Sequence, residues 1–260
     1  MGASSEVPAL RRGLAILTAM TGRAGPVSAA TLARELDLPR SSTYHLLAEL
    51  TAAGFVVRLP EEHRYALGVA AFELGSAYLR HDPLERLAGP VLRRLVDQVD
   101  CTAHLGVLHG GELLYLIKER PSRPQTLITD VGVRLPAHLT ASGRAMLAHL
   151  PAAQVRASFP TGFARRTGRG PRTLPELRRT LAAERRLGWA VEDGHVTGEF
   201  ASVACPVFGA DQWPSAAISL TFRHVCEPGG RADCGATWPE LAARVRRAAE
   251  DLSGRMGGRR

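Results

Sequence analysis

Residues 40–50 concentrate side chains that can hydrogen-bond to the bases and phosphates of DNA. Thr43, Leu46, Leu47 and Leu50 recur at helical spacing, so a helix over this segment packs them inward and turns its polar residues outward. Those outward residues are Arg40, Ser41, Ser42, Tyr44 and His45. Such a face suits the major groove, where side chains read base edges and helix N-termini favour phosphate. In the alternative interpretation the serines are N-caps and Tyr44 is a core residue, but capping accounts for only one serine.

A second set of residues can bind a small molecule. Ser142 and Gly143 open a predicted helix whose free N–H groups suit a carboxylate. Ser219 and Thr221 stand two apart on a predicted strand, so their hydroxyls point to one face. The residues expected to point the other way, into the core, are Val203, Ile218 and Leu220. This pattern predicts a cavity for a small anionic ligand; in the alternative, Ser219 and Thr221 pair across strands.

The sequence shows no catalytic or metal-binding motif, so we expect no catalytic residue, no metal and no cofactor. It contains no G-x-S-x-G elbow, H-E-x-x-H helix or phosphate loop, and residues 140–144 (TASGR) lack the first glycine of an elbow. The four cysteines are too few and scattered for a disulfide framework and form no C-x-x-C pair. A metal cluster of Cys226, Cys234, His224 and Asp233 is the alternative that their spacing does not support.

The elements around the first set of residues form a predicted winged helix-turn-helix. The first helix carries Leu10, Leu14 and Leu17 at helical spacing and ends in the turn residues 22–26. Ser28 is the expected N-cap of a second helix, which ends before Pro39, and the third helix follows at once. Two short strands, at residues 55–57 and 64–67, complete a hairpin.

A break at residues 82–83 separates a helix over residues 69–80 from a larger second domain. Its predicted strands lie at residues 102–108, 112–118, 126–130, 189–193, 202–208 and 216–222. Its predicted helices lie at residues 84–99, 141–150, 175–188 and 239–252. Because the strands arrive as hairpin neighbours with helices between them, the expected fold class is α+β, with a largely antiparallel sheet flanked by helices.

We expect the helix over residues 69–80 to couple the two domains and to form part of a dimer contact. Its residues Phe72 and Leu79 and the small residues 75–77 make a face more apolar than an exposed linker sustains. The expected division is therefore residues 1–68 for DNA binding, 69–82 for the linker helix and 83–260 for the second domain.

The net charge of +8 does not lie at the DNA-binding end of the chain. Residues 1–80 hold eight arginines and seven acidic residues, whereas residues 156–186 hold nine arginines and only Glu176 and Glu184. A solvated arginine face is the favoured interpretation of that stretch, ahead of a nucleic-acid surface.

No segment approaches the roughly 18 apolar residues of a membrane span, and residues 13–20 suit a first helix better than a signal peptide. We therefore expect a cytoplasmic protein with reduced cysteines and no membrane partner.

Several strings, in order along the chain, resemble the IclR family of bacterial transcriptional regulators. They are residues 8–17 (PALRRGLAIL), 38–47 (LPRSSTYHLL), 54–56 (GFV), 64–68 (RYALG), 135–145 (LPAHLTASGRA), 188–193 (GWAVED), 202–208 (SVACPVF) and 216–221 (AAISLT). One string is weak evidence, but the series covers nearly the whole chain and is specific.

The resemblance implies a homodimer or homotetramer that binds operator DNA and a small effector, often a metabolic acid or an aromatic compound. It implies a winged helix, a linker helix and a GAF-like effector domain, with Arg64 of the hairpin as a further DNA contact. The effector residues that it implies by position are Leu135, His138, Ala141, Ser142, Gly143, Glu192, Ser202, Ser219 and Thr221. Ser202 stands where several relatives have cysteine and Glu192 where they have aspartate, so their effectors do not transfer directly.

A ligand-responsive regulator is the favoured function, and a repressor ahead of an activator because most of the family represses. A small-molecule enzyme and a ligand-free architectural DNA-binding protein are the alternatives. The first lacks a catalytic motif, and the second leaves some 180 residues unexplained.

Overall fold

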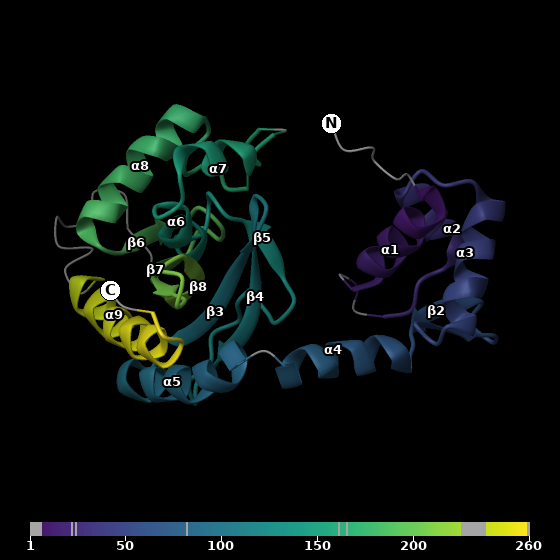
Figure 1. The fold of residues 1–260 in the computed structure, drawn as a ribbon, viewed down its shortest axis with the longest axis horizontal. Helices are drawn as coiled ribbons and strands as arrows, with labels where there is room; N and C mark the ends of the chain where they lie inside the picture. Colours follow the sequence, from purple (N-terminus) through teal and green to yellow (C-terminus); the bar gives the residue numbers. More distant parts are fainter. Residues whose placement is uncertain are drawn as a thin grey trace. The chain divides into compact units, whose positions relative to one another are not determined.

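The computed structural model describes residues 7–21, 23, 25–81, 83–160, 162–164, 166–224 and 238–258 (Figure 1). The chain separates into two compact units, Met1–Pro83 and Leu84–Arg260. The cysteines and the aspartate of the candidate metal cluster, and residues 225–237 as a whole, lie outside the described residues, as do the side chains of Ser76 and Leu79. The linker role of residues 69–82 stays a prediction.

The first unit is a winged helix-turn-helix. Its elements are α1 (Pro8–Thr21), α2 (Ala29–Glu35), α3 (Arg40–Ala52), β1 (Val56–Leu59), β2 (Arg64–Leu67) and α4 (Val69–His81). Ser28 caps α2 as predicted, since its side chain accepts the N–H of Thr31. The strands β1 and β2 pair antiparallel, with Val56 opposite Leu67.

The core of the first unit gathers one face of each of its first three helices. Ile16 and Met20 of α1 pack with Leu32 of α2 and Leu47 of α3. The predicted leucine stripe of α1 is only partly its buried face, because Leu10 and Leu14 stay exposed while Gly13 and Ile16 are buried. Leu17 lies at the edge of the core.

The second unit is built on one six-stranded sheet in the order β5-β4-β3-β8-β7-β6, in which all neighbours are antiparallel. The strands are β3 (Thr102–His109), β4 (Glu112–Glu119), β5 (Arg134–Pro136), β6 (Ala190–Asp193), β7 (Phe200–Phe208) and β8 (Pro214–Arg223). The helices are α5 (Pro83–Val99), α6 (Ala141–Leu147), α7 (Ala152–Ala157), α8 (Leu174–Leu187) and α9 (Trp238–Arg255). The predicted α+β class with an antiparallel sheet is confirmed.

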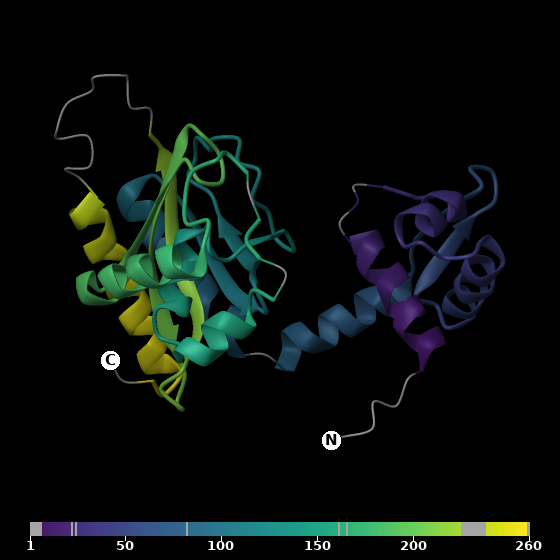
Figure 2. The ribbon, with the colours of Figure 1, turned by 90° about the horizontal axis from the view of Figure 1, so that it is seen from above.

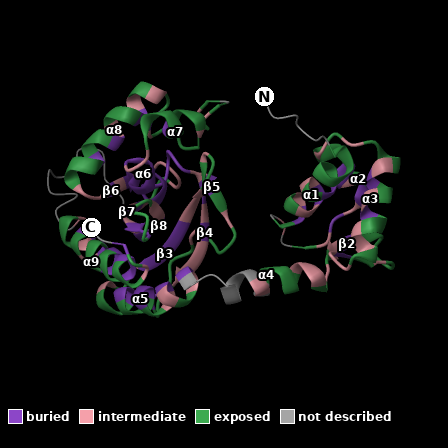
Figure 3. Ribbon diagram, viewed as in Figure 1, coloured by how far each residue is buried: buried purple, intermediate pink, exposed green. Residues whose placement is uncertain are grey.

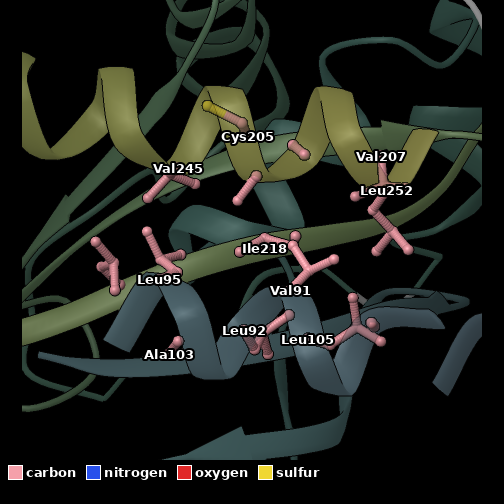
Figure 4. Packing of buried hydrophobic residues seen from close by; sticks show 14 of the residues in the cluster. Val91, Leu92, Leu95, Ala103, Leu105, Cys205, Val207, Ile218, Val245 and Leu252 are labelled. Carbon is pink, nitrogen blue, oxygen red and sulfur yellow. The ribbon is translucent and has the colours of Figure 1, made fainter. Parts of the chain in front are cut away.

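The two faces of this sheet have different coverings (Figure 2). On one face α5 and α9 bury a cluster of aliphatic side chains, among them Val91, Leu95, Val245 and Leu252 (Figure 4). Val203, Ile218 and Leu220 belong to this cluster, as the strand alternation predicts. On the other face α6 packs on Tyr115, Ala204 and Ala217, and this is the face to which Ser219 belongs.

Two predicted elements of the second unit are wrong: the strand over residues 126–130 and the length of the helix over residues 141–150. Residues 126–130 form no strand, because Thr129 is held by side chains: its hydroxyl bonds to His104 Nε2 at 2.9 Å and its carbonyl accepts from Lys118 Nζ. The edge strand is instead β5, which pairs with β4. The predicted helix 141–150 ends at Leu147, and α7 follows after Pro151.

A buried ion pair joins the helices α6 and α8 to the strand β6. Arg144 of α6 is fully buried, and its Nε lies 3.0 Å from a carboxylate oxygen of Glu184 on α8. The guanidinium also donates to the carbonyls of His138 and Val191, and Glu184 accepts the N–H of Val191 at 3.2 Å. The pair therefore fixes α6 and α8 to the beginning of β6.

We expect Arg144→Met to lower the free energy of unfolding by about 3–5 kcal/mol, because it leaves the carboxylate of Glu184 buried without its cation. The double variant Arg144→Met/Glu184→Leu should recover much of that loss, since no buried charge remains. Denaturant unfolding measures both variants. The control Arg255→Met removes an exposed pair with Asp251 and should cost at most about 1 kcal/mol. Equal losses in Arg144→Met and Arg255→Met would contradict the role of the buried pair.

Candidate functional site

The third helix exposes most of the side chains predicted to contact DNA. Arg40, Ser41, Tyr44 and His45 are exposed, and Ser42 is half-buried. The opposite face of α3 is closed, because Thr43 and Leu47 are buried and Leu46 and Leu50 pack beside them. The N-cap position is Pro39, so neither serine caps the helix, and Tyr44 is not a core residue. The alternative interpretation of these residues is therefore wrong.

Arg64 lies at the start of β2, on the hairpin next to α3. Its side chain is exposed, and its Nη1 donates to the carbonyl of Pro26 at 3.5 Å. The bond is long, so the guanidinium can exchange it for an anion. Its contact with DNA stays a prediction.

The second unit contains a cavity between α6 and the face of the sheet that carries Ser219. Its volume is about 30 Å³, which holds about one or two water molecules, so a larger ligand would have to displace its walls. Six of the nine predicted effector residues line it: Ala141, Ser142, Glu192, Ser202, Ser219 and Thr221. Ser202 and Thr221 are register partners, and their hydroxyl oxygens lie 3.0 Å apart. Thr221 therefore both pairs with a residue of the neighbouring strand and lines the cavity, although the two roles were alternative predictions.

Glu192 places a carboxyl group in this cavity. It is buried, and one carboxylate oxygen accepts the N–H groups of His195 at 2.7 Å and Val196 at 3.0 Å. Burial raises the pKa of Glu192, and these two N–H donors and Arg144 only partly oppose that rise. No arginine, lysine or histidine is among the described residues that line the cavity. Apart from the carboxyl group of Glu192, negative charge on a ligand would thus meet N–H and O–H dipoles.

The start of α6 supplies some of those dipoles. Thr140 caps the helix by accepting the N–H of Gly143 at 3.0 Å. The N–H groups of Ala141 and Ser142 have no acceptor in the described part of the chain. Thr140, Ala141 and Ser142 all line the cavity.

Three predicted effector residues do not line the cavity, and each has a packing role instead. Leu135 is buried beside Tyr115 in the core under α6. His138 is enclosed by two phenylalanine rings and its Nε2 lies 3.0 Å from the carbonyl oxygen of Ala164; burial lowers the pKa of this imidazole. Gly143 approaches Ala137 so closely that a Cβ would stand 2.2 Å from its carbonyl oxygen.

Eight further residues line the cavity that were not among the predicted effector residues. They are Tyr115, Leu127, Ile128, Thr129, Thr140, Val196, Thr197 and Phe200. The capping preference of threonine before residues 141–147 could have indicated Thr140. The loop residues 127–129 and 196–200 follow no periodic pattern, so only the folded structure brings them together.

His104 holds in place the loop that contains Thr129, one of the residues that line the cavity. Its ring lies 4.9 Å from that of Tyr115, and its Nε2 bonds to Thr129. Burial, followed by the nearby charge of Lys118, lowers the pKa of His104 to about 3. The imidazole is therefore neutral at physiological pH and acts here through hydrogen bonding and packing.

No cluster of three or more metal-binding side chains occurs among the described residues. In the same part of the chain, no helix combines the length and the apolar composition needed to cross a membrane.

Comparisons with known proteins agree with this architecture. The sequence model of the IclR helix-turn-helix domain matches residues 9–60, and that of the bacterial transcriptional regulator IclR C-terminal domain matches residues 76–254. The uncharacterized HTH-type transcriptional regulator RhmR of Escherichia coli is 34% identical over 84% of this chain and 83% of its own. The transcriptional repressor IclR of the same species is 30% identical over 84% of this chain and 81% of its own.

Solved structures share the fold. A putative IclR regulator from Silicibacter matches with a TM-score of 0.83 and 27% identity, covering 96% of this chain and 97% of its own. An IclR homologue from Microbacterium hydrocarbonoxydans, solved with 4-hydroxybenzoate, matches with a TM-score of 0.78 and 23% identity, covering 95% of this chain and 98% of its own. With both domain models matched in order, the chain belongs to the IclR family of bacterial transcriptional regulators.

Proposed function

We propose that this protein is a sequence-specific, ligand-responsive repressor that binds operator DNA through α3. The observation that carries the proposal is the exposed face of α3, where arginine, tyrosine, histidine and serine stand free above a closed apolar face. The relatives IclR of E. coli and AllR of Klebsiella pneumoniae are named repressors, which favours repression over activation here. Because a protein with this function acts on bacterial DNA, the proposal includes a cytoplasmic location.

We further propose that a small organic effector binds in the cavity beside α6. Hydroxyl groups and two free N–H groups give it polar partners, and Tyr115, Leu127 and Phe200 give it apolar contact. This lining suits a hydroxylated aromatic compound, or an organic acid whose carboxylate faces the start of α6. The effector changes operator affinity only by its unequal affinity for two states of the protein, with a usual coupling of about 1–3 kcal/mol.

The protein is proposed to bind DNA as a homodimer, which can pair into a tetramer, with α4 in the dimer contact. Phe72 and Leu74 of α4 are 73% and 64% exposed and border an apolar groove formed with Leu17 and Phe55 of the same unit. Exposed apolar surface of this kind is unfavourable in water and is typical of a contact surface. A second copy of the chain is the proposed occupant.

Replacing Arg40 and His45 together by alanine should weaken operator binding, by about 1–3 kcal/mol for each base that the variant no longer reads. Both side chains are exposed, so folding should be unchanged. An operator selected from random duplexes, expected to be roughly palindromic, serves as the probe in a binding titration. The matched variant Arg93→Ala/His109→Ala, exposed in the second unit, should bind normally. Unchanged affinity and salt dependence in the α3 variant would refute the assignment.

Ser219→Ala with Thr221→Val should abolish the effector response while operator binding persists. Each hydroxyl removed costs a typical hydrogen bond of about 1 kcal/mol, or more where a charged ligand group is left unpaired. A thermal-shift screen of organic acids and aromatic metabolites identifies the effector, because a ligand of the folded state raises its stability. Ser215→Ala, on the same strand outside the cavity, is the control. A full response in the double variant would count against the cavity.

Phe72→Glu should shift the protein from dimer towards monomer, because it places a charge in the proposed apolar contact. Sedimentation velocity across a concentration series measures the effect. Glu73→Gln, the neighbouring exposed residue on α4, is the control and should leave the dimer intact. A wild-type chain that stays monomeric at micromolar concentration would contradict the proposed contact.

A further inference from the structure

The helix α8 presents an arginine face to solvent. Its inner side packs through Leu177 and Leu181, and Glu184 is buried with them. The outer side carries four exposed arginines, and most of the helix is coloured as exposed in Figure 3. These four are Arg178, Arg179, Arg185 and Arg186, named here the α8 arginines.

The α8 arginines form two pairs on one side of the helix. The pairs are seven residues apart, which is two helical turns or about 10.5 Å along the axis. Ala182 lies between them and is exposed, so no large side chain separates the two pairs. A length of about 10.5 Å corresponds to about three base pairs of duplex DNA, whose phosphates lie roughly 3.4 Å apart along the axis of each strand.

Both acidic residues of α8 are engaged elsewhere. Glu176 accepts the backbone N–H of Arg172 at 2.8 Å, before the helix begins. Glu184 is taken by the buried Arg144 at 3.0 Å. Within the described ranges, the α8 arginines consequently have no acidic partner.

The helix dipole explains only half of this arrangement. Arg185 and Arg186 lie in the last turn, where cations are favourable. Arg178 and Arg179 lie in the middle of the helix, where the dipole does not stabilise a cation and where neighbouring positive charges repel one another. The positive surface also continues beyond the helix, since Arg246 of α9 donates to the carbonyl of Leu187 at 3.1 Å.

We propose that the α8 arginines bind the phosphate backbone of duplex DNA flanking the operator, a second DNA contact made by the effector domain. Phosphate fits because the planar guanidinium donates to it in bidentate geometry. Duplex DNA is favoured over an acidic protein because its phosphates recur at regular intervals that match the spacing of about 10.5 Å between the two arginine pairs. The proposal rests on the operator binding proposed above, and it adds affinity without sequence information.

The test compares two duplexes with the full-length protein: the selected operator alone, and the same operator extended on both sides with unrelated sequence. Wild-type protein should bind the extended duplex more tightly and with a steeper dependence on salt. In the variant with all four α8 arginines changed to glutamine, this gain should disappear, and the salt slope should fall by about 0.9 for each phosphate that is no longer neutralised. Affinity for the operator alone should change little.

A matched variant separates the α8 surface from net charge. It changes Arg93, Arg94, Arg223 and Arg255 to glutamine, four exposed arginines that already face acidic partners. This variant loses the same formal charge and should keep the gain from flanking DNA. The four-lysine variant of the α8 arginines should restore most of the salt dependence, because the charge is retained.

The outcomes distinguish this proposal from the proposed function. No gain from flanking DNA in the wild type, an unchanged gain in the α8 variant, or an equal loss in the matched variant would each overturn the α8 contact while leaving operator binding intact. If the wild type selects no operator, the proposed function fails instead, and the same variants are compared on random duplexes. If the four-glutamine variant does not fold, the pair Arg178→Gln/Arg179→Gln is measured in its place.

Discussion

The cavity of the second unit depends on one buried cation. Arg144 is fully buried, and its ion pair and its hydrogen bonds to carbonyl groups fix the positions of α6, α8 and β6 relative to one another. Ser142 reaches the cavity from α6 and Glu192 reaches it from β6, so both depend on the position of Arg144. Such a pair adds little net stability compared with apolar packing, but it penalises any arrangement that separates its partners. The main effect of this ion pair is therefore to position the elements that form the cavity, and its contribution to stability is secondary.

The approach of α6 to the sheet follows from small side chains on both sides. Ala141 and Ala145 of the helix meet Ala190, Ala204 and Ala217 of the strands. Gly143 extends this closeness to the loop before the helix, where a Cβ would overlap Ala137. Small residues bring the start of α6 within reach of the strand hydroxyls, whereas larger side chains would separate them. On the other face of the sheet, α5 and α9 pack through a larger cluster that includes Val91, Leu92, Val245 and Leu252.

Periodic patterns predicted most of this fold, and they failed where single polar contacts decide the structure. The strands β3, β4, β7 and β8 and the helices α3, α5 and α9 lie close to where apolar runs, helical spacing and turn residues predicted them. Residues 126–130 look like a strand by composition, yet His104 and Lys118 hold them as a loop. Neither contact leaves a local pattern, because the partners lie 25 and 11 residues away in the chain.

The residues that line the cavity also fall into two groups, those that the sequence predicts and those that it does not. Those on regular elements, such as Ser219 and Thr221, could be placed from strand alternation. Those on loops, such as Thr129 and Phe200, could not. His138 and Leu135 were placed by position within a family string, but their side chains turn into aromatic and aliphatic packing. Position in a shared string indicates the element on which a residue lies, and the direction of its side chain depends on neighbours distant in sequence.

The hydrogen bond between Ser202 and Thr221 has a consequence for selectivity. In this pair one hydroxyl donates to the other, which leaves one O–H donor and the remaining lone pairs for a guest molecule. The mutual bond also fixes the direction in which that donor and those lone pairs point. A guest that matches these directions would be preferred over one of equal size whose polar groups lie elsewhere.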